Sequence, residues 1–248
     1  PPPPPQKHTP IRRQRQMCIR DSYYCVLVVK YSIRYKPAFA AIFVTLDPGD
    51  SIIAEAGAMT SMDGRLSMKT KFSGGFFPAL LRKFLGGESL FVNVFENKTS
   101  QPLNVTLTQS IIGDIECLEL TGNEICFQPG AYIASSPKVK LGVKFAGFAS
   151  WFTGEGLFRL KVSGHGKVFF GAYGGLSKQD IAGEFVVDNN HLVAYSSNIK
   201  MSIGLSGGLI SSLTSGEGLV YRLKGNGVIY LQSRSIEGLV QFLSPKVR

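Results

Sequence analysis

The stretch FTGEGLF, residues 152–158, has two close copies elsewhere in the chain. LGGESLF covers residues 85–91, and TSGEGLV covers residues 214–220. The glutamates of the three copies are 67 and 62 residues apart. Similar elements at similar spacing are typical of a repeated unit whose neighbours cover one another's exposed faces. We therefore expect three tandem structural units.

Each copy places a glutamate beside glycines just ahead of an apolar strand. Glycine lets the backbone turn closely, and the carboxylate can accept hydrogen bonds from N–H groups of the turn. We interpret these elements as structural corners. The alternative is that the three carboxylates cluster, which would raise their pKa values and suit acid–base chemistry. The residues of these corners are Glu88, Glu155, Glu217, Gly87, Gly154, Gly156, Gly216 and Gly218.

The segments between these corners have strand patterns. Phe158, Leu160 and Val162 alternate with Arg159, Lys161 and Ser163, which predicts an apolar face and a solvent face. The glycine-containing triplets at 164–166 and 225–227 predict tight hairpin turns. In the first unit, ENKTSQP at 96–102 takes the place of such a triplet.

The residues therefore predict an all-β chain with one short helical insert at 78–85, which begins at Pro78 and ends at a Gly-Gly pair. Residues 1–22, with five prolines and a basic tract, form a non-native or disordered leader or, in the alternative, a basic targeting arm. One β domain covers 31–238, and 239–248 is a C-terminal tail. The expected units cover about 31–108, 109–178 and 179–238.

The net charge of +10 overstates how basic the expected domain is, because the leader carries five basic residues and one acidic residue. The charged residues of the rest of the chain are spread out, without blocks of like charge. This distribution argues against a basic stripe that binds nucleic acid. The apolar run at 23–29 is too short to span a bilayer. Cys25, Cys117 and Cys126 lie among apolar neighbours and are expected to be buried thiols in a reducing compartment.

Three apolar loops, at 72–87, 145–152 and 205–213, are the strongest candidates for an interaction surface. Basic residues near them would suit an anionic membrane surface or a membrane-protein partner. The alternative is burial in subunit contacts or in the core. The candidate contact residues are Phe76, Phe77, Phe148, Trp151, Arg82 and Lys83.

Catalytic and metal-binding patterns are missing from the sequence. His165 and His191 are 26 residues apart and lie in turns, and no His/Cys/Asp spacing is typical of a metal site. Asp188 and His191 are expected to have a structural role in their turn. No phosphate-binding or nucleophile motif occurs, so we expect no enzyme, no metal and no cofactor.

Several stretches together resemble one family. YKPAFAAIFVTLDPGDSIIAEAGAMTSMDG, FLGGESLFVNVF, FTGEGLFRLKVSGHGKVFFGAYG, VVDNNHLVAYSS and SGEGLVYRLKGNGVIYLQSRS are similar to the mitochondrial-biogenesis family called altered inheritance of mitochondria, number twenty-four. The resemblance runs from about Tyr31 to Ile236. It implies β-sandwich units like the tryptophan RNA-binding attenuator protein, triplicated in a pseudo-threefold arrangement, and a homotrimer with a ring of nine units.

The resemblance and the residues together predict a non-enzymatic, homo-oligomeric β-ring scaffold or interaction protein at a membrane surface. Mitochondrial family members are linked to inner-membrane organisation, and this chain resembles the prokaryotic type. We expect a cytoplasmic location with membrane association, or a mitochondrial one in a eukaryote. The alternative is a nucleic-acid or small-ligand binding module by fold analogy, in which Lys138, Lys140 and Lys144 would contact phosphates.

Overall fold

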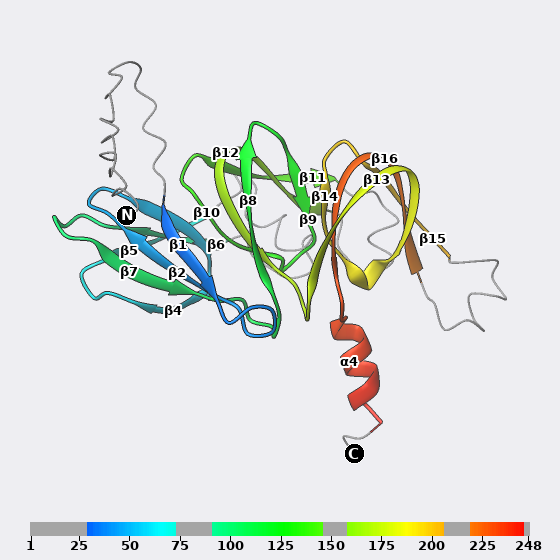
Figure 1. Ribbon diagram of the computed structural model, residues 1–248, viewed down its shortest axis with the longest axis horizontal. Helices are drawn as coiled ribbons and strands as arrows, with labels where there is room; N and C mark the ends of the chain where they lie inside the picture. The colour runs from blue at the N-terminus through cyan, green and yellow to red at the C-terminus, as the bar shows by residue number, and fades with distance from the viewer. Residues whose placement is uncertain (1–28, 73–90, 146–157, 206–218, 246–248) are drawn as a thin grey trace, which may run out of the picture.

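The computed structural model describes residues 29–72, 91–145, 158–205 and 219–245. In these ranges the chain is mostly antiparallel β-structure with one short C-terminal helix (Figure 1). This confirms the predicted β class. The strands form a small sheet at the N-terminal end and a large sheet that begins beside it and extends along the molecule.

The small sheet has the strand order β1-β2-β7-β4. These strands are β1 (Lys30–Arg34), β2 (Ala41–Leu46), β7 (Leu103–Leu107) and β4 (Met59–Met62). Buried Ile42, Val44 and Leu46 alternate with half-buried Phe43 and Thr45 along β2, so one face of the sheet lies on the core. β1 and β4 are the edges of this sheet.

The large sheet has the strand order β13-β16-β14-β9-β12-β10-β3-β6-β5. Three further strands pair outside this path, β8 and β11 with β12 and β15 with β16. The twelve strands are β3 (Ser51–Glu55), β5 (Ser67–Phe72), β6 (Phe91–Glu96), β8 (Ile115–Thr121), β9 (Ile125–Phe127), β10 (Tyr132–Ser135), β11 (Val139–Phe145), β12 (Phe158–Gly171), β13 (Leu176–Asp188), β14 (Leu192–Ser196), β15 (Lys200–Leu205) and β16 (Leu219–Gln232).

The prediction of hairpin turns at 164–166 and 225–227 is wrong, because both triplets lie inside long continuous strands, β12 and β16. Gly164 has φ 101°, and a side chain there would lie 2.7 Å from the Lys138 carbonyl oxygen. The glycines allow a bend at which the strand changes partners. β12 pairs with β11 up to Gly164 and with β8 from His165 onward.

The first part of the chain makes the same change with a loop between β6 and β7. Asn97 is fully buried in this loop. Its Nδ2 donates to the carbonyl oxygens of Leu46 and Gln101 at 2.8 and 2.7 Å. Its Oδ1 accepts from the backbone N–H and the hydroxyl of Thr99. One satisfied amide thus holds the turn that glycines make elsewhere.

The helix α4 (Ile236–Leu243) corrects two predictions. The expectation that only 78–85 is helical is wrong, and the boundary of the predicted tail at 238/239 falls inside α4. Ser235 caps the helix, because its hydroxyl accepts from the Gly238 N–H. The predicted helix at 78–85 lies outside the described residues.

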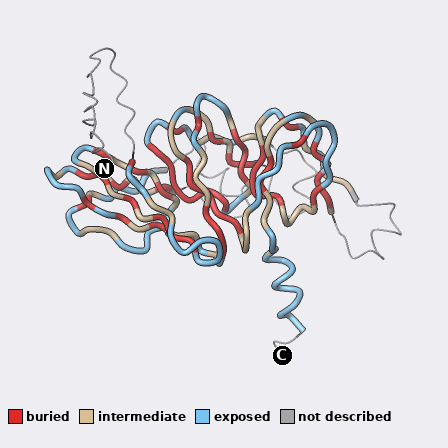
Figure 2. Tube along the Cα trace, in the orientation of Figure 1, coloured by how far each residue is buried: buried red, intermediate tan, exposed pale blue. Residues whose placement is uncertain are grey.

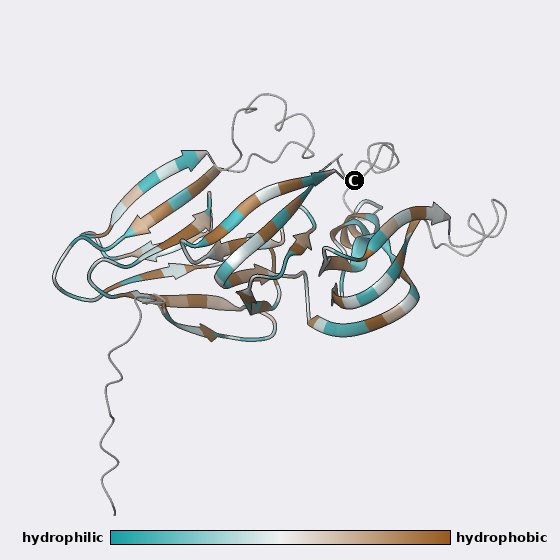
Figure 3. Cartoon of the chain, turned by 90° about the horizontal axis from the view of Figure 1, so that it is seen from above, coloured by the Kyte–Doolittle hydropathy of each residue, from teal (hydrophilic) through white to brown (hydrophobic). Residues whose placement is uncertain are grey.

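Buried side chains form three clusters in chain order (Figure 2). Phe95 and Phe169 belong to the first, Phe127 and Phe170 to the second, and Tyr221 and Ile229 to the third. Hydrophilic and hydrophobic residues alternate along many strands (Figure 3). α4 has no buried residue and projects from one edge of the molecule (Figures 1 and 2).

Candidate interaction surface

Most residues that the sequence singled out lie outside the described residues. This holds for the corner residues Glu88, Glu155, Glu217, Gly87, Gly154, Gly156, Gly216 and Gly218. It also holds for the loop residues Phe76, Phe77, Phe148, Trp151, Arg82 and Lys83. Their roles therefore stay predictions.

The turn with Asp188 and His191 is described. It is a short 3-10 helix, η1 (Asn189–His191), whose N-cap is Asp188. The Asp188 carboxylate accepts a hydrogen bond from the Asn190 N–H at 2.8 Å. Nδ1 of His191 donates to the Gln232 carbonyl oxygen at 2.7 Å. Gln232 Nε2 in turn donates to the Asn190 carbonyl oxygen at 2.8 Å. These bonds tie the turn to the end of β16.

Four loop segments, 35–40, 109–114, 172–175 and 233–235, run side by side along one edge of the molecule. Ala40 N–H donates to the Gly113 carbonyl oxygen at 3.1 Å, and Asp114 N–H donates to that of Gly174 at 2.8 Å. Ser233 N–H then donates to the Gly175 carbonyl oxygen at 2.9 Å. This loop row joins the first, middle and last parts of the chain and leads directly into α4, along the lower edge in Figure 1.

Large apolar side chains gather along this edge. Tyr35, Phe39 and Ile112 on the loop row are 65%, 70% and 59% exposed. On α4, Ile236, Leu239, Val240 and Leu243 are exposed as well. Their spacing of three and four residues puts them on one face of the helix. We call these seven residues the apolar edge.

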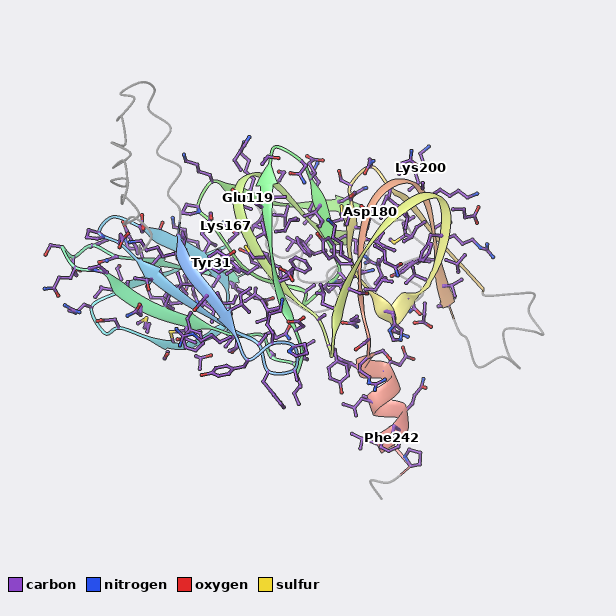
Figure 4. All side chains as sticks on the ribbon, in the orientation of Figure 1. Tyr31, Glu119, Lys167, Asp180, Lys200 and Phe242 are labelled. Carbon is purple, nitrogen blue, oxygen red and sulfur yellow. The ribbon has the colours of Figure 1, made fainter. Side chains whose placement is uncertain are left out.

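Phe242 lies near the far end of α4, away from the sheets (Figure 4). It is also exposed and widens the apolar surface of the helix. The polar side of α4 carries Glu237 and Gln241. More than half of the large hydrophobic residues that are exposed in the described ranges lie on the loop row or α4. The edge is therefore more apolar than the rest of the described surface.

Basic residues flank the apolar edge. Arg34 precedes Tyr35, and its guanidinium carbon lies 4.4 Å from the ring centre of Phe43. Lys36 Nζ pairs with the carboxylates of Glu116 at 3.0 Å and Asp114 at 3.6 Å. Arg234 lies two residues before the start of α4 and is exposed. Two arginines therefore accompany the apolar edge, while the charge of Lys36 is shared with two acids.

A groove of about 430 Å³ lies between the loop row and the first turn of α4. Gln109, Gln128, Pro129 and Ile236 are among its lining residues. Within the described residues, Gln109 Oε1 and Gln128 Nε2 are buried atoms that have no hydrogen-bond partner. Besides these amides and apolar side chains, Glu55 and Ser110 also line the groove.

The described residues contain no group of three or more His, Cys, Asp or Glu side chains that could hold a metal ion. Burial raises the pKa of both described thiols, Cys117 and Cys126, which makes them poorer nucleophiles. Cys126 is buried as predicted, whereas Cys117 is half-buried. Among the described helices, none has the length and hydropathy to cross a bilayer.

Arg159 corrects a prediction. It was expected to face solvent with Lys161 and Ser163, yet it is fully buried. Leu160 and Val162 are buried as expected, so both faces of β12 are covered at this point. Arg159 Nη2 donates to the Tyr221 hydroxyl at 2.9 Å, which joins β12 to β16.

Replacing Tyr221 by Phe is expected to lower the free energy of unfolding by about 2 kcal/mol. The change removes the buried hydroxyl that accepts a hydrogen bond from the charged Arg159 guanidinium, and hydrogen bonds to charged groups contribute about 1.5–3 kcal/mol to stability. Urea unfolding followed by circular dichroism measures the effect. Tyr35→Phe, at an exposed position, is the matched control and is expected to change stability by less than about 0.5 kcal/mol. Equal unfolding curves for the two variants would contradict the role of this bond.

The three lysines of the nucleic-acid alternative do not share one environment. Lys140 and Lys138 are exposed, whereas Lys144 is half-buried and donates from Nζ to the Ser197 carbonyl oxygen at 2.8 Å. Lys144 thus links β11 to the turn after β14. The structure does not present the three ammonium groups together to a phosphate backbone.

Sequence reasoning missed the whole apolar edge. The sequence does contain a pattern that indicates α4. Ser235 is a typical N-cap residue, and the apolar residues after it lie at 236, 239, 240 and 243, which is helical spacing. No sequence pattern indicates that Tyr35, Phe39 and Ile112 share a surface, because isolated apolar residues in loops show no periodicity. Only hydrogen bonds between distant segments bring them to one edge.

Comparisons with known proteins agree with this architecture. Residues 31–234 match the family described as mitochondrial biogenesis AIM24. An uncharacterized protein of Streptococcus pyogenes serotype M6 is 26% identical over 218 residues, which cover 84% of this chain and 87% of the relative. The crystal structure of a Streptococcus pyogenes protein superposes with a TM-score of 0.71 at 23% identity and covers 88% of this chain and 100% of that chain. This last likeness shows a shared fold.

Proposed function

The chain belongs to the mitochondrial biogenesis family AIM24, and we propose that it acts as a homo-oligomeric β-scaffold without catalytic chemistry, whose apolar edge contacts a membrane surface. Its oligomeric state in this proposal is the homotrimer that the family resemblance implies. The observation that carries the proposal is the apolar edge itself.

Strand pairing supports three tandem units as the basis of this scaffold. β6, β12 and β16 each pair antiparallel with the strand before them, β5, β11 and β15. The pairs that flank the three apolar loops correspond: Phe72 with Phe91, Phe145 with Phe158, and Leu205 with Leu219. The same hairpin thus recurs in each third of the chain, which is what a triplicated unit requires.

The apolar edge suits a bilayer surface for two reasons. Apolar side chains that move from water into the membrane interface stabilise binding, by about 1.5–3 kcal/mol for each side chain that becomes fully buried. Arg34 and Arg234 beside them would meet anionic headgroups, each contributing about 1 kcal/mol near such a surface. The predicted loop residues, such as Phe77 and Trp151, are a second candidate membrane contact in this proposal.

Vesicle flotation tests the membrane contact. We expect the chain to float with phosphatidylcholine vesicles that contain phosphatidylglycerol, and less with phosphatidylcholine alone. Leu239→Ser with Val240→Ser should weaken partitioning about tenfold or more, because two exposed apolar side chains are lost. Met68→Ser with Val143→Ser, on exposed positions of β5 and β11, is the matched control.

A third variant, Phe77→Ser with Trp151→Ser, separates the apolar edge from the loops. If it alone abolishes flotation, the loops and not the apolar edge make the contact. If the wild type does not float with either vesicle, the membrane part of the proposal is wrong. A protein partner would then be the alternative occupant of the apolar edge.

A further inference from the structure

We propose that copies of this chain join head to tail by pairing β4 of one copy with residues 185–187 of β13 in the next. This inference rests on the homo-oligomer of the proposed function and names the surface that builds it. β4 is an edge of the small sheet and β13 is an edge of the large sheet. They lie at opposite ends of the long axis of the molecule (Figure 1).

The chain already makes this kind of joint twice within itself. At the first joint β10 pairs antiparallel with β3, with Ala134 opposite Ala54 and Ser135 opposite Ile53. At the second joint β14 pairs antiparallel with β9, with Ala194 opposite Phe127 and Tyr195 opposite Cys126. Each joint attaches one third of the chain to the third before it.

β4 matches the strands that form one half of these joints. β10 pairs with β12, β14 with β16, and β4 with β7. In each pairing the register shifts near the start of the first-named strand, at 132/134, 192/194 and 59/61 respectively. Each strand is also followed by the same tight turn. Val139 N–H donates to Ser136 O, Ile199 N–H to Ser196 O, and Leu66 N–H to Asp63 O, at 3.1, 3.0 and 3.0 Å. β4 therefore corresponds to β10 and β14, but no described strand pairs with its outer edge.

The end of β13 corresponds to β9, the strand that forms the other half of the second joint. β9 pairs with the first part of β12, with Phe127 opposite Leu160. Residues 185–187 pair in the same way with the first part of β16, with Val187 opposite Tyr221. Leu160 and Tyr221 correspond because they face Val143 and Ile203, at the same place on β11 and β15. β13 pairs with β16 alone among the described strands, and none of them covers its outer edge.

The side chains on the two open edges suit a protein joint and not water. At the internal joints the corresponding residues, Phe127, Cys126 and Ala194, are fully buried. On the open edges Met59, Phe185 and Val186 are 38%, 36% and 48% exposed. Soluble proteins usually protect open edges with charges, prolines or bulges. Residues 185–187 carry no charge and no proline.

The two internal joints set the register of the proposed one. Ser61 takes the place of Ala194 and faces Val187, and Met62 takes the place of Tyr195 and faces Val186. Among the described strands, β4 alone offers the matching half with an unpaired edge. It lies too far from β13 of the same chain to reach it, so the occupant is a second copy (Figure 1). Since the two halves differ, the contact is heterologous, and repeated use closes a ring or extends a filament.

The backbone pattern at the second joint shows which N–H groups the new joint would use. Gln128 N–H donates across that joint to the Val193 carbonyl oxygen at 2.9 Å. Its counterpart in β13 is Asp188, and outward N–H groups recur every second residue, so Val186 N–H also points outward. A change at Val186 can therefore break the joint without removing a hydrogen bond to β16.

Cysteine cross-linking tests this pairing. Residues that face each other across antiparallel strands have Cα atoms about 4.5–5.5 Å apart, within disulfide range. Met62→Cys and Val186→Cys are made as separate variants, oxidised alone and as a mixture, and the linked peptides are mapped by mass spectrometry. We expect a 62–186 disulfide in the mixture and neither a 62–62 nor a 186–186 disulfide. Met68→Cys mixed with Val186→Cys is the control and should give no link.

Light scattering of the full chain separates this inference from the proposed function. We expect an oligomer for the wild type and a monomer for Val186→Pro and Val186→Lys, with unchanged circular dichroism. A wild-type monomer would overturn both the oligomeric scaffold and the joint. A wild-type oligomer that forms no 62–186 link, and that keeps its mass in both Val186 variants, would overturn the joint alone.

Discussion

Replacing Gly113 by Ala is expected to lower the free energy of unfolding by about 3 kcal/mol, at the upper end of the usual effect of overpacking. A Cβ at this position would lie 1.9 Å from the Ala172 carbonyl oxygen and 2.7 Å from the Gly174 nitrogen. Both are backbone atoms, so no side chain can turn away to make room. The strand bridges of Gly113 with Phe39 and with Gly174 would have to separate.

Urea unfolding followed by circular dichroism measures this effect. Gly64→Ala is the matched control, because no atom lies within 4 Å of a Cβ there. Its expected effect is below about 0.5 kcal/mol. The same denaturation midpoint for the two variants would show that the loop row is not closely packed. Vesicle flotation of Gly113→Ala should also weaken, because the loop row positions Phe39 and Ile112.

Asn97→Ala is expected to destabilise the fold by about 3 kcal/mol. The buried amide donates to two carbonyl oxygens and accepts from two groups of Thr99. Each buried polar group left without its partner costs about 1–3 kcal/mol, and the small cavity adds to this. We expect the loop between β6 and β7 to lose its fixed shape.

Hydrogen exchange and urea unfolding together test the role of Asn97. The Thr99 amide should exchange faster in Asn97→Ala than in the wild type, because its acceptor is gone. Asn104→Ala is the control. Asn104 accepts one exposed bond from Thr45, so its loss should change stability by less than about 1 kcal/mol. A similar loss in both variants would argue against a special role for the buried amide.

The alternation of residues predicted the core better than it predicted the turns. Leu160 and Val162 are buried as their spacing requires, but Arg159 between them is buried too. A period of two identifies the apolar face of a strand, and it cannot report that the other face is also covered. The glycines at 164 and 166 have positive φ, as their sequence suggested. They serve a bend in one strand and not a hairpin, because the strand finds new partners on both sides of the bend.

The candidate site could be predicted from the sequence less well than the fold. The apolar edge combines residues 35, 39 and 112 with a helix that begins at 236. The proposed joint likewise depends on which strand edges stay open. Both properties follow from contacts between segments that are far apart in the chain, and local patterns do not record such contacts.

The sequence alone determined that this chain is a β-protein with recurring elements, because side-chain alternation and glycine placement act over a few residues. It also indicated the family through several ordered motifs. Only the tertiary structure decided that the glycine triplets bend long strands, that Arg159 is buried, and which edges remain exposed. The physical reason is that burial and strand pairing are set by neighbours across the sheet, and each residue meets those neighbours only after the chain has folded.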